Sequence, residues 1–216
     1  MQTFDCGDPA QRATGIASAI STLKSGRLVV LPTDTVYGLG ADAFNSEAVA
    51  ALLAAKGRGR NMPVPVLVGS WNTIDGLVYS VPPQARLLIE KFWPGALSLV
   101  VRQAPSLSWD LGDANGTVML RMPLHAVAIE LLREVGPMAV SSANMSGQPA
   151  AVTAKDAQDQ LGRLVDVYLE AGPAARQAAS TIVDLTGPVP KVLRQGPITA
   201  EQIAEVLGIE AASLVD

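Results

Sequence analysis

The sequence predicts an α/β protein, with a twisted mixed β-sheet flanked by helices in a single domain over residues 1–216. Short apolar runs rich in Val and Leu, typical of buried strands, alternate with longer amphipathic segments typical of helices. No repeat or low-complexity tract divides the chain, and 49% hydrophobic residues are enough for one sizeable core. A turn-like Gly187-Pro188 between two strand-like runs indicates that some neighbouring strands are antiparallel.

The expected helices are bounded by capping residues, prolines and glycines. Asp8-Pro9 supplies an N-cap and a first helical position, and that helix ends at Gly26. Thr199 and Gln202 have the spacing of a capping box, which predicts a last helix. The expected helices cover residues 8–26, 46–55, 82–92 and 124–135 and continue from 199. The expected strands cover residues 27–31, 64–68, 96–102, 117–121, 138–142, 181–185 and 191–194.

Two segments lie outside the expected helices and strands. Residues 32–40 are dense in hydroxyls and glycine, so their side chains and backbone could line a pocket, and Gly38 and Gly40 are interpreted as serving a tight turn. The other segment, Gln103 to Gly116, is a long loop of unassigned role.

Composition excludes several classes of protein. A formal net charge of −4 argues against a protein that coats nucleic acid, so any polyanion site must be local. One cysteine and one histidine exclude an internal disulfide and a zinc centre, and no metal site is expected. The N-terminus lacks the pattern of a secretory signal, and the longest uncharged stretch contains prolines and polar residues. We therefore expect a cytoplasmic protein with no membrane association.

The run Lys56-Gly57-Arg58-Gly59-Arg60 predicts an anion site. It places three cations in five residues, and no carboxylate occurs between Glu47 and Asp75. The alternative is a solvated helix end, where the helix dipole favours positive charge. Interleaved glycines favour the anion site, because backbone N–H groups can then approach the ligand beside the side chains.

Other polar groups follow predicted strands, where open α/β sheets bind ligands. Ser142 and Asn144 lie after one strand, although an ordinary Ser/Asn/Gly turn explains them equally well. Arg121 and Arg194 each close a strand. Together with the cationic run they predict a basic central cavity for a multiply charged ligand.

Common nucleotide and hydrolase motifs do not account for this site. Residues Gly38 to Ala43 match G-x-G-x-x-A, but the acid expected about twenty residues later is missing, which argues against a dinucleotide. The sequence has neither a P-loop nor the G-x-S-x-G pattern of a hydrolase elbow.

Seven motifs in order resemble those of the YrdC-like threonylcarbamoyl-AMP synthases, from about Gly26 to Leu207. The resemblance is to the short, single-domain type. The motifs are Pro32-Thr33-Asp34-Thr35-Val36-Tyr37-Gly38-Leu39-Gly40, Lys56-Gly57-Arg58, Phe92-Trp93-Pro94-Gly95, Arg121-Met122-Pro123-Leu124-His125, Ser142-Ala143-Asn144-Met145-Ser146-Gly147, Ser180-Thr181-Ile182-Val183-Asp184 and Leu193-Arg194-Gln195-Gly196-Pro197.

The resemblance implies a nucleotidyltransferase with the YrdC-like fold. Its reaction joins L-threonine, bicarbonate and ATP into L-threonylcarbamoyl-AMP with release of pyrophosphate, and Mg²⁺ is carried with ATP. The product would pass to a downstream tRNA threonylcarbamoyl transferase, which modifies the adenosine beside the anticodon. The resemblance assigns ATP binding to Arg58, Thr117, Ser142, Asn144 and Arg194, threonine binding to Thr35, Arg121 and Ser180, and charge neutralisation to Lys56 and Arg58.

Two departures from the family pattern concern this site. Ala179 stands where the family usually has glutamate, and Leu67 stands where many members have histidine. What replaces these two contacts is left open.

Two other functions remain as alternatives. One is an RNA-binding module that uses the same basic cavity, with weak RNA binding; few aromatic residues and the net negative charge weigh against it. The other is a carbamoyl-transfer domain of a larger maturation protein, which the lack of zinc motifs makes less favourable.

Overall fold

The computed structural model describes residues 1–215, which alternate between strands and helices as the sequence predicts. The elements in chain order are β1 (Gln2–Asp5), α1 (Pro9–Lys24), β2 (Val29–Leu31), β3 (Gly38–Asp42), α2 (Ser46–Ala55), β4 (Val66–Leu67), α3 (Ile74–Leu77), α4 (Pro83–Phe92), β5 (Leu97–Arg102), β6 (Thr117–Arg121), α5 (Ala126–Val135), β7 (Met138–Ser142), α6 (Ala154–Leu161), β8 (Val167–Glu170), β9 (Thr181–Asp184), β10 (Lys191–Arg194) and α7 (Ala200–Leu207).

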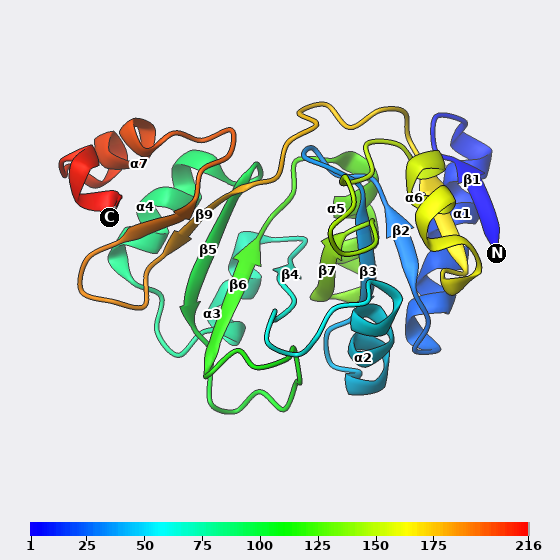
Figure 1. Cartoon of the computed structure of the whole chain (residues 1–216), viewed down its shortest axis with the longest axis horizontal. Coiled ribbons are helices and arrows are strands. Elements are labelled where there is room, and N and C mark those ends of the chain that lie inside the picture. The colour runs from blue at the N-terminus through cyan, green and yellow to red at the C-terminus, as the bar shows by residue number, and fades with distance from the viewer. Residues whose placement is uncertain (216) are drawn as a thin grey trace.

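Within the described residues, ten strands form one sheet in the order β1-β8-β2-β3-β7-β4-β6-β5-β9-β10. The pairs β1–β8, β2–β8, β4–β6 and β5–β9 are parallel, and the other neighbours are antiparallel. The termini consequently lie at opposite ends of the molecule (Figure 1). The expected mixed sheet is confirmed, including the antiparallel pair β9–β10 around Gly187-Pro188.

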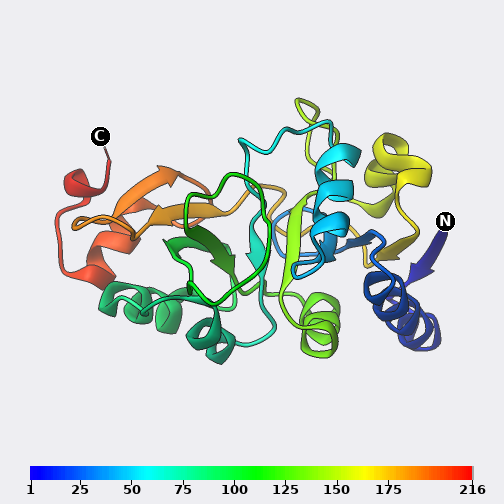
Figure 2. The same ribbon diagram turned by 90° about the horizontal axis from the view of Figure 1, so that it is seen from below.

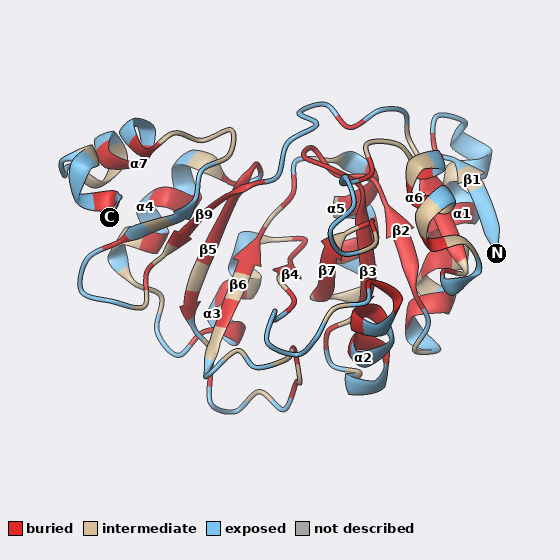
Figure 3. Ribbon diagram, viewed as in Figure 1, coloured by how far each residue is buried: buried red, intermediate tan, exposed pale blue. Residues whose placement is uncertain are grey.

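Helices cover both faces of the sheet. In Figure 2, helices α1, α3, α4 and α5 lie below the sheet and α2 and α6 lie above it. Helices α1 and α5 bury Leu23 and Leu131 in one hydrophobic cluster with strand residues such as Val29. A second, larger cluster contains the buried residues of the other helices, and strands such as β2 and β8 contribute alternate residues to both clusters. The buried residues lie in the strands and on the inward sides of the helices (Figure 3).

Capping residues set several helix ends where the sequence predicts them. Asp8 accepts hydrogen bonds from two backbone N–H groups of the first turn of α1, and Thr199 and Gln202 form the expected capping box of α7. Helix α2 and strands β6, β7 and β10 have the predicted bounds.

The tight turn expected at Gly38 and Gly40 is wrong, because both glycines lie inside strand β3. This strand is buried between β2 and β7. A Cβ on Gly38 would lie 2.6 Å from Val140 Cγ1, and one on Gly40 would lie 2.6 Å from Met138 Cε. The glycines therefore allow close packing over the strand and do not serve a turn.

Five further elements differ from the sequence prediction. Strands β1 and β8 and helices α3 and α6 were not predicted, and β4 is two residues long where 64–68 was expected. Outside β4, Val64 N–H bonds to Leu111 O in the irregular loop, and Val68 N–H bonds to Arg121 O. No helix of the described chain is long and apolar enough to cross a membrane.

Replacing Gly38 with alanine should destabilise the fold. Val140 is β-branched and stiff, so the added methyl group forces a shift of the strands and should lower the free energy of unfolding by about 1–3 kcal/mol. Denaturant unfolding measures this change. Gly76→Ala is the matched control because nothing lies within 4 Å of its added Cβ. Equal stability of Gly38→Ala and the unmodified chain would contradict the packing role.

Candidate functional site

A cavity of about 490 Å³ opens among the central and C-terminal strands. Its walls come from β3, β4, β5, β6, β7, β9 and β10 and from loops that include Thr33, residues 35–37 and residues 61–63. Three arginines, Arg58, Arg121 and Arg194, line it, and none of the described lining residues is a carboxylate. This volume lies in the usual range for small-molecule sites.

Neighbouring strands place one wall of the cavity. Ser98 on β5 and Arg194 on β10 both pair in register with Ile182 on β9. The Ser98 and Ser180 hydroxyl oxygens are 2.8 Å apart. Arg194 donates from Nε (3.0 Å) and Nη2 (2.8 Å) to Ser180 O and from Nη2 to Ser180 Oγ (3.2 Å). Arg194 is thus anchored at the start of β9, and burial lowers the pKa of its guanidinium.

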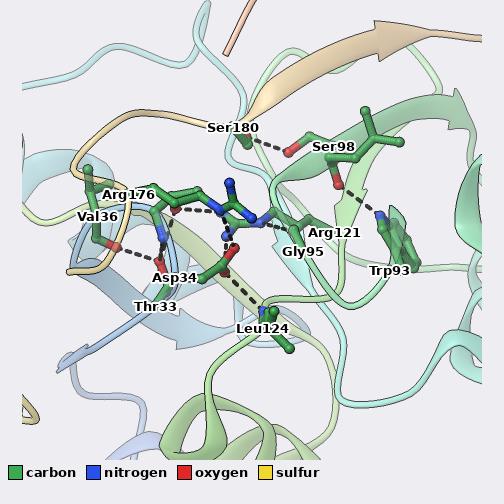
Figure 4. A network of polar contacts seen from close by, with 12 residues as sticks. Thr33, Asp34, Val36, Trp93, Gly95, Ser98, Arg121, Leu124, Arg176 and Ser180 are labelled. Atoms are coloured by element: carbon green, nitrogen blue, oxygen red, sulfur yellow. Dashed lines mark hydrogen bonds and ion pairs between the residues drawn. The ribbon is translucent and has the colours of Figure 1, made fainter. Parts of the chain in front are cut away.

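Arg121 at the end of β6 is the most enclosed arginine of the cavity (Figure 4). Its Nε donates to Gly95 O (2.9 Å), Nη1 to Thr35 Oγ1 (2.8 Å) and Nη2 to Asp34 Oδ1 (2.5 Å). Burial lowers the pKa of Arg121, and the charge of Asp34 opposes this shift. A guanidinium has five N–H groups, so these three bonds leave one N–H on each Nη.

Lys56, the C-cap residue of α2, lies in a buried nest of oxygens. Its Nζ donates to Ser142 O (2.5 Å), Asn144 O (2.7 Å) and Asn144 Oδ1 (3.3 Å), which matches the three N–H groups of an ammonium. Burial, followed by the charge of Arg58, lowers the pKa of Lys56 to about 8. The lysine therefore ties the end of α2 to the segment after β7.

The other two cations of the run, Arg58 and Arg60, have different surroundings. Arg58 lines the cavity, contacts Ser141 Oγ at 3.3 Å, and has a buried Nε without a hydrogen-bond partner among residues 1–215. Arg60 instead forms two 2.9 Å bonds to Asp110 and lies 3.4 Å from Asp113. The acids that pair with Arg60 lie outside the acid-free segment between Glu47 and Asp75, in loop 103–116, which folds back from far along the chain.

The structure brings most, but not all, of the expected site residues to the cavity. The expected residues that line it are Thr35, Arg58, Arg121, Ser142, Ser180 and Arg194. Thr117, Lys56 and Asn144 are not among the lining residues: Thr117 Oγ1 donates to Ala114 O, and Asn144 holds Lys56 and two nearby carbonyls. Leu67 and Ala179 do line the cavity, so its wall is apolar at both departures from the family pattern.

Two polar residues of the site were missed by the sequence analysis. Ser98 lines the cavity, and the signal for it was a lone hydroxyl inside the apolar strand β5. Asp34 lies beneath Arg121, inside a motif that was recognised but for which only Thr35 was assigned a role. A buried carboxylate beside an arginine could not be identified before the strands were paired.

Comparison with known proteins places this architecture in one family. The model of the Sua5, YciO and YrdC proteins, described as "Telomere recombination", matches residues 21–196. A Mycobacterium tuberculosis protein named, provisionally, a threonylcarbamoyl-AMP synthase is 73% identical over 99% of this chain and 98% of its own length. The Bacillus subtilis threonylcarbamoyl-AMP synthase is 39% identical over 89% of this chain and 56% of its own length.

A solved structure agrees with these sequence matches. Sua5 of Pyrococcus abyssi in complex with L-threonine superposes with a TM-score of 0.89 at 30% identity, over 96% of this chain and 61% of that longer protein. The fold, the order of the cavity residues and these matches lead to one conclusion: the chain belongs to the Sua5/YciO/YrdC family.

Proposed function

We propose that this chain is a nucleotidyltransferase that makes L-threonylcarbamoyl-AMP from L-threonine, bicarbonate and ATP, with release of pyrophosphate, for threonylcarbamoyladenosine modification of tRNA. The observation that carries the proposal is a cavity whose described lining includes three arginines and several hydroxyls but no carboxylate, which suits a substrate pair rich in negative charge. The names of the relatives and the threonine complex of Pyrococcus abyssi Sua5 support the choice of substrates.

The two substrates would occupy different ends of the cavity. Thr35, Arg121 and Ser180 would hold threonine, with the free N–H groups of Arg121 directed to its carboxylate. Arg58, Ser142 and Arg194 would hold ATP. The other three expected residues, Thr117, Asn144 and Lys56, would support the site without lining the cavity. Lys56 and Asn144 would do so by fixing the segment that carries Ser142.

The reaction mainly requires that the substrates be positioned and that the negative charge of the phosphates be neutralised. Bicarbonate loses hydroxide to give CO₂, and the neutral threonine amine bonds to the CO₂ carbon. The proton lost from the nitrogen joins the hydroxide as water, which leaves a carbamate. A carbamate oxygen then attacks the α-phosphorus, and pyrophosphate leaves with the electrons of the broken P–O bond. Arg58 and Arg194 stabilise charge on the phosphates, and Mg²⁺ carried with ATP neutralises the leaving pyrophosphate.

The remaining steps lie outside this cavity. The mixed anhydride would pass to a downstream tRNA threonylcarbamoyl transferase, and we place the reaction in the cytoplasm. RNA binding as the main function is not favoured, since Arg58, Arg121 and Arg194 line one cavity of about 490 Å³. Purified chain should release pyrophosphate only when threonine, bicarbonate and ATP are all present. Salt-sensitive RNA retention without pyrophosphate release would refute the proposal.

Arg58→Ala should abolish ATP-dependent turnover with little change in stability, because its guanidinium faces the cavity and not the core. Titration calorimetry with ATP and pyrophosphate release measure the effect. Arg163→Ala is the control, because Arg163 is exposed and is not among the residues that line the cavity. Equal loss of ATP binding in both variants would remove Arg58 from the phosphate site.

Arg121→Lys should raise the KM for threonine about tenfold or more, since a lysine lacks the planar fork and a charged hydrogen bond is worth roughly 1.5–3 kcal/mol. The KM for ATP should stay the same. Thermal unfolding reports separately on the loss of the Asp34 and Gly95 contacts. Arg102→Lys, an exposed substitution on β5, is the control. A higher KM for ATP with unchanged KM for threonine would show that Arg121 serves the nucleotide.

A further inference from the structure

One oxygen of the buried Asp34 carboxylate lacks a donor. Oδ1 accepts hydrogen bonds from Arg121 Nη2 (2.5 Å) and from Leu124 N–H (3.0 Å). Oδ2 is buried and has no hydrogen-bond partner within residues 1–215. Asp34 is only 5% exposed, and a carboxylate oxygen without a hydrogen bond in such surroundings is costly. Oδ2 therefore has an ion-pair partner in Arg176 but no hydrogen bond.

Arg176 is placed to supply that hydrogen bond. Its Nε lies 3.9 Å from Asp34 Oδ2, too far for a hydrogen bond, and its side chain is 43% exposed. Its backbone N–H already donates to Asp34 O at 3.2 Å. Figure 4 shows the side chains of Arg121 and Arg176 converging on Asp34. A shift of about 1 Å by a half-exposed side chain would close the remaining gap.

Arg176 belongs to segment 171–180, the connection from β8 to β9. This connection runs over the top of the molecule in Figure 1 and ends at Ser180, in the cavity wall. Most of it is exposed, and Ala174 N–H anchors it to Val152 O (2.8 Å). Gln177, with φ +51°, adopts a left-handed conformation that is uncommon for a side-chain-bearing residue. Contacts made by Arg176 therefore bear directly on where Ala179 and Ser180 lie.

The charges around Arg121 indicate when Arg176 should move onto Asp34 Oδ2. A substrate carboxylate that takes the free N–H groups of Arg121 shares one guanidinium with Asp34, and the two carboxylates repel each other. Arg176 already lies within ion-pair distance of Oδ2, and a hydrogen bond from its guanidinium to that oxygen would offset this repulsion. We propose that Arg176 is a positioning residue for threonine: when the substrate carboxylate binds Arg121, Arg176 donates a hydrogen bond to Asp34 Oδ2 and holds segment 171–180 over that end of the cavity. The inference rests on the proposed function, because the carboxylate is that of threonine.

Trypsin offers a direct probe of this closure, since it cuts after exposed arginines. Cleavage between Arg176 and Gln177 gives fragments 1–176 and 177–216, which mass spectrometry identifies in the unmodified chain. Saturating threonine should slow this cut by about threefold or more, because cleavage follows the population of the open segment. Cleavage after the exposed Arg163 should not change. Threonine amide, which lacks the carboxylate, should give no protection.

Kinetics of Arg176→Ala separate positioning from a structural role. The variant should raise the KM for threonine about fivefold, the upper range for a half-exposed ion pair, and leave the KM for ATP and the thermal midpoint unchanged. Arg176→Lys should restore part of the threonine affinity. In an Asp34→Asn background, Arg176→Ala should have no further effect on the KM for threonine. Arg163→Ala is the matched control.

If threonine fails to slow cleavage after Arg176, titration calorimetry of threonine with the unmodified chain shows which proposal has failed. If threonine binds but neither slows the cut after Arg176 nor depends on Arg176, this inference is overturned and the proposed function stands. If threonine does not bind, both fail.

Discussion

The buried guanidinium of Arg121 is the contact on which the rest of the site depends. It joins Asp34 and Thr35, which follow β2, to Gly95, which precedes β5, and to its own strand β6. Taking such a charge out of water is unfavourable unless it is paired and hydrogen-bonded, and here it is both. The same network holds the start of the 124–135 region, because Asp34 also accepts the N–H of Leu124. Segments about ninety residues apart are therefore fixed around one side chain.

The chain has a net charge of −4 but places three arginines around a cavity that has no carboxylate among its described lining residues. The cations near that cavity are held in different ways. Lys56 is satisfied by carbonyl and amide oxygens and acts as a brace, while Arg60 is neutralised by aspartates on the outer loop. Arg58 retains a buried Nε with no partner among the described residues. A cation whose hydrogen bonds are incomplete is the one best able to bind an incoming phosphate.

Loop 103–116 supports the cavity from outside, although its irregular sequence gives no sign of this role. Its Asp110 pairs with Arg60, and its Leu111 O accepts the N–H of Val64. These contacts fix residues 60–64, and within this segment Asn61 and Met62 line the cavity. The loop therefore shapes the site without lining it.

Local signals in the sequence were sufficient for much of the fold. Caps at Asp8 and Thr199 and the apolar run Met138–Ser142 define elements through short-range contacts, and their bounds follow from neighbouring residues. Strand β3 was missed because its glycines signal a turn locally, and only the side chains of β7 show that a Cβ would not fit. Strand β1 was missed because it is a short exposed edge whose partner β8 lies about 165 residues away.

The features of the site also divide into those predicted from the sequence and those known only from the structure. The sequence by itself determined the mixed α/β class, the motifs that carry Arg58, Arg121 and Arg194, and the hydroxyls that accompany them, because these are matters of residue type and spacing. Only the tertiary structure decided that Lys56 faces carbonyls, that Arg60 turns to the outer loop and that Asp34 supports Arg121. The reason is physical: the partner of a charged side chain is set by which segments the sheet brings together, and those segments are distant in the sequence.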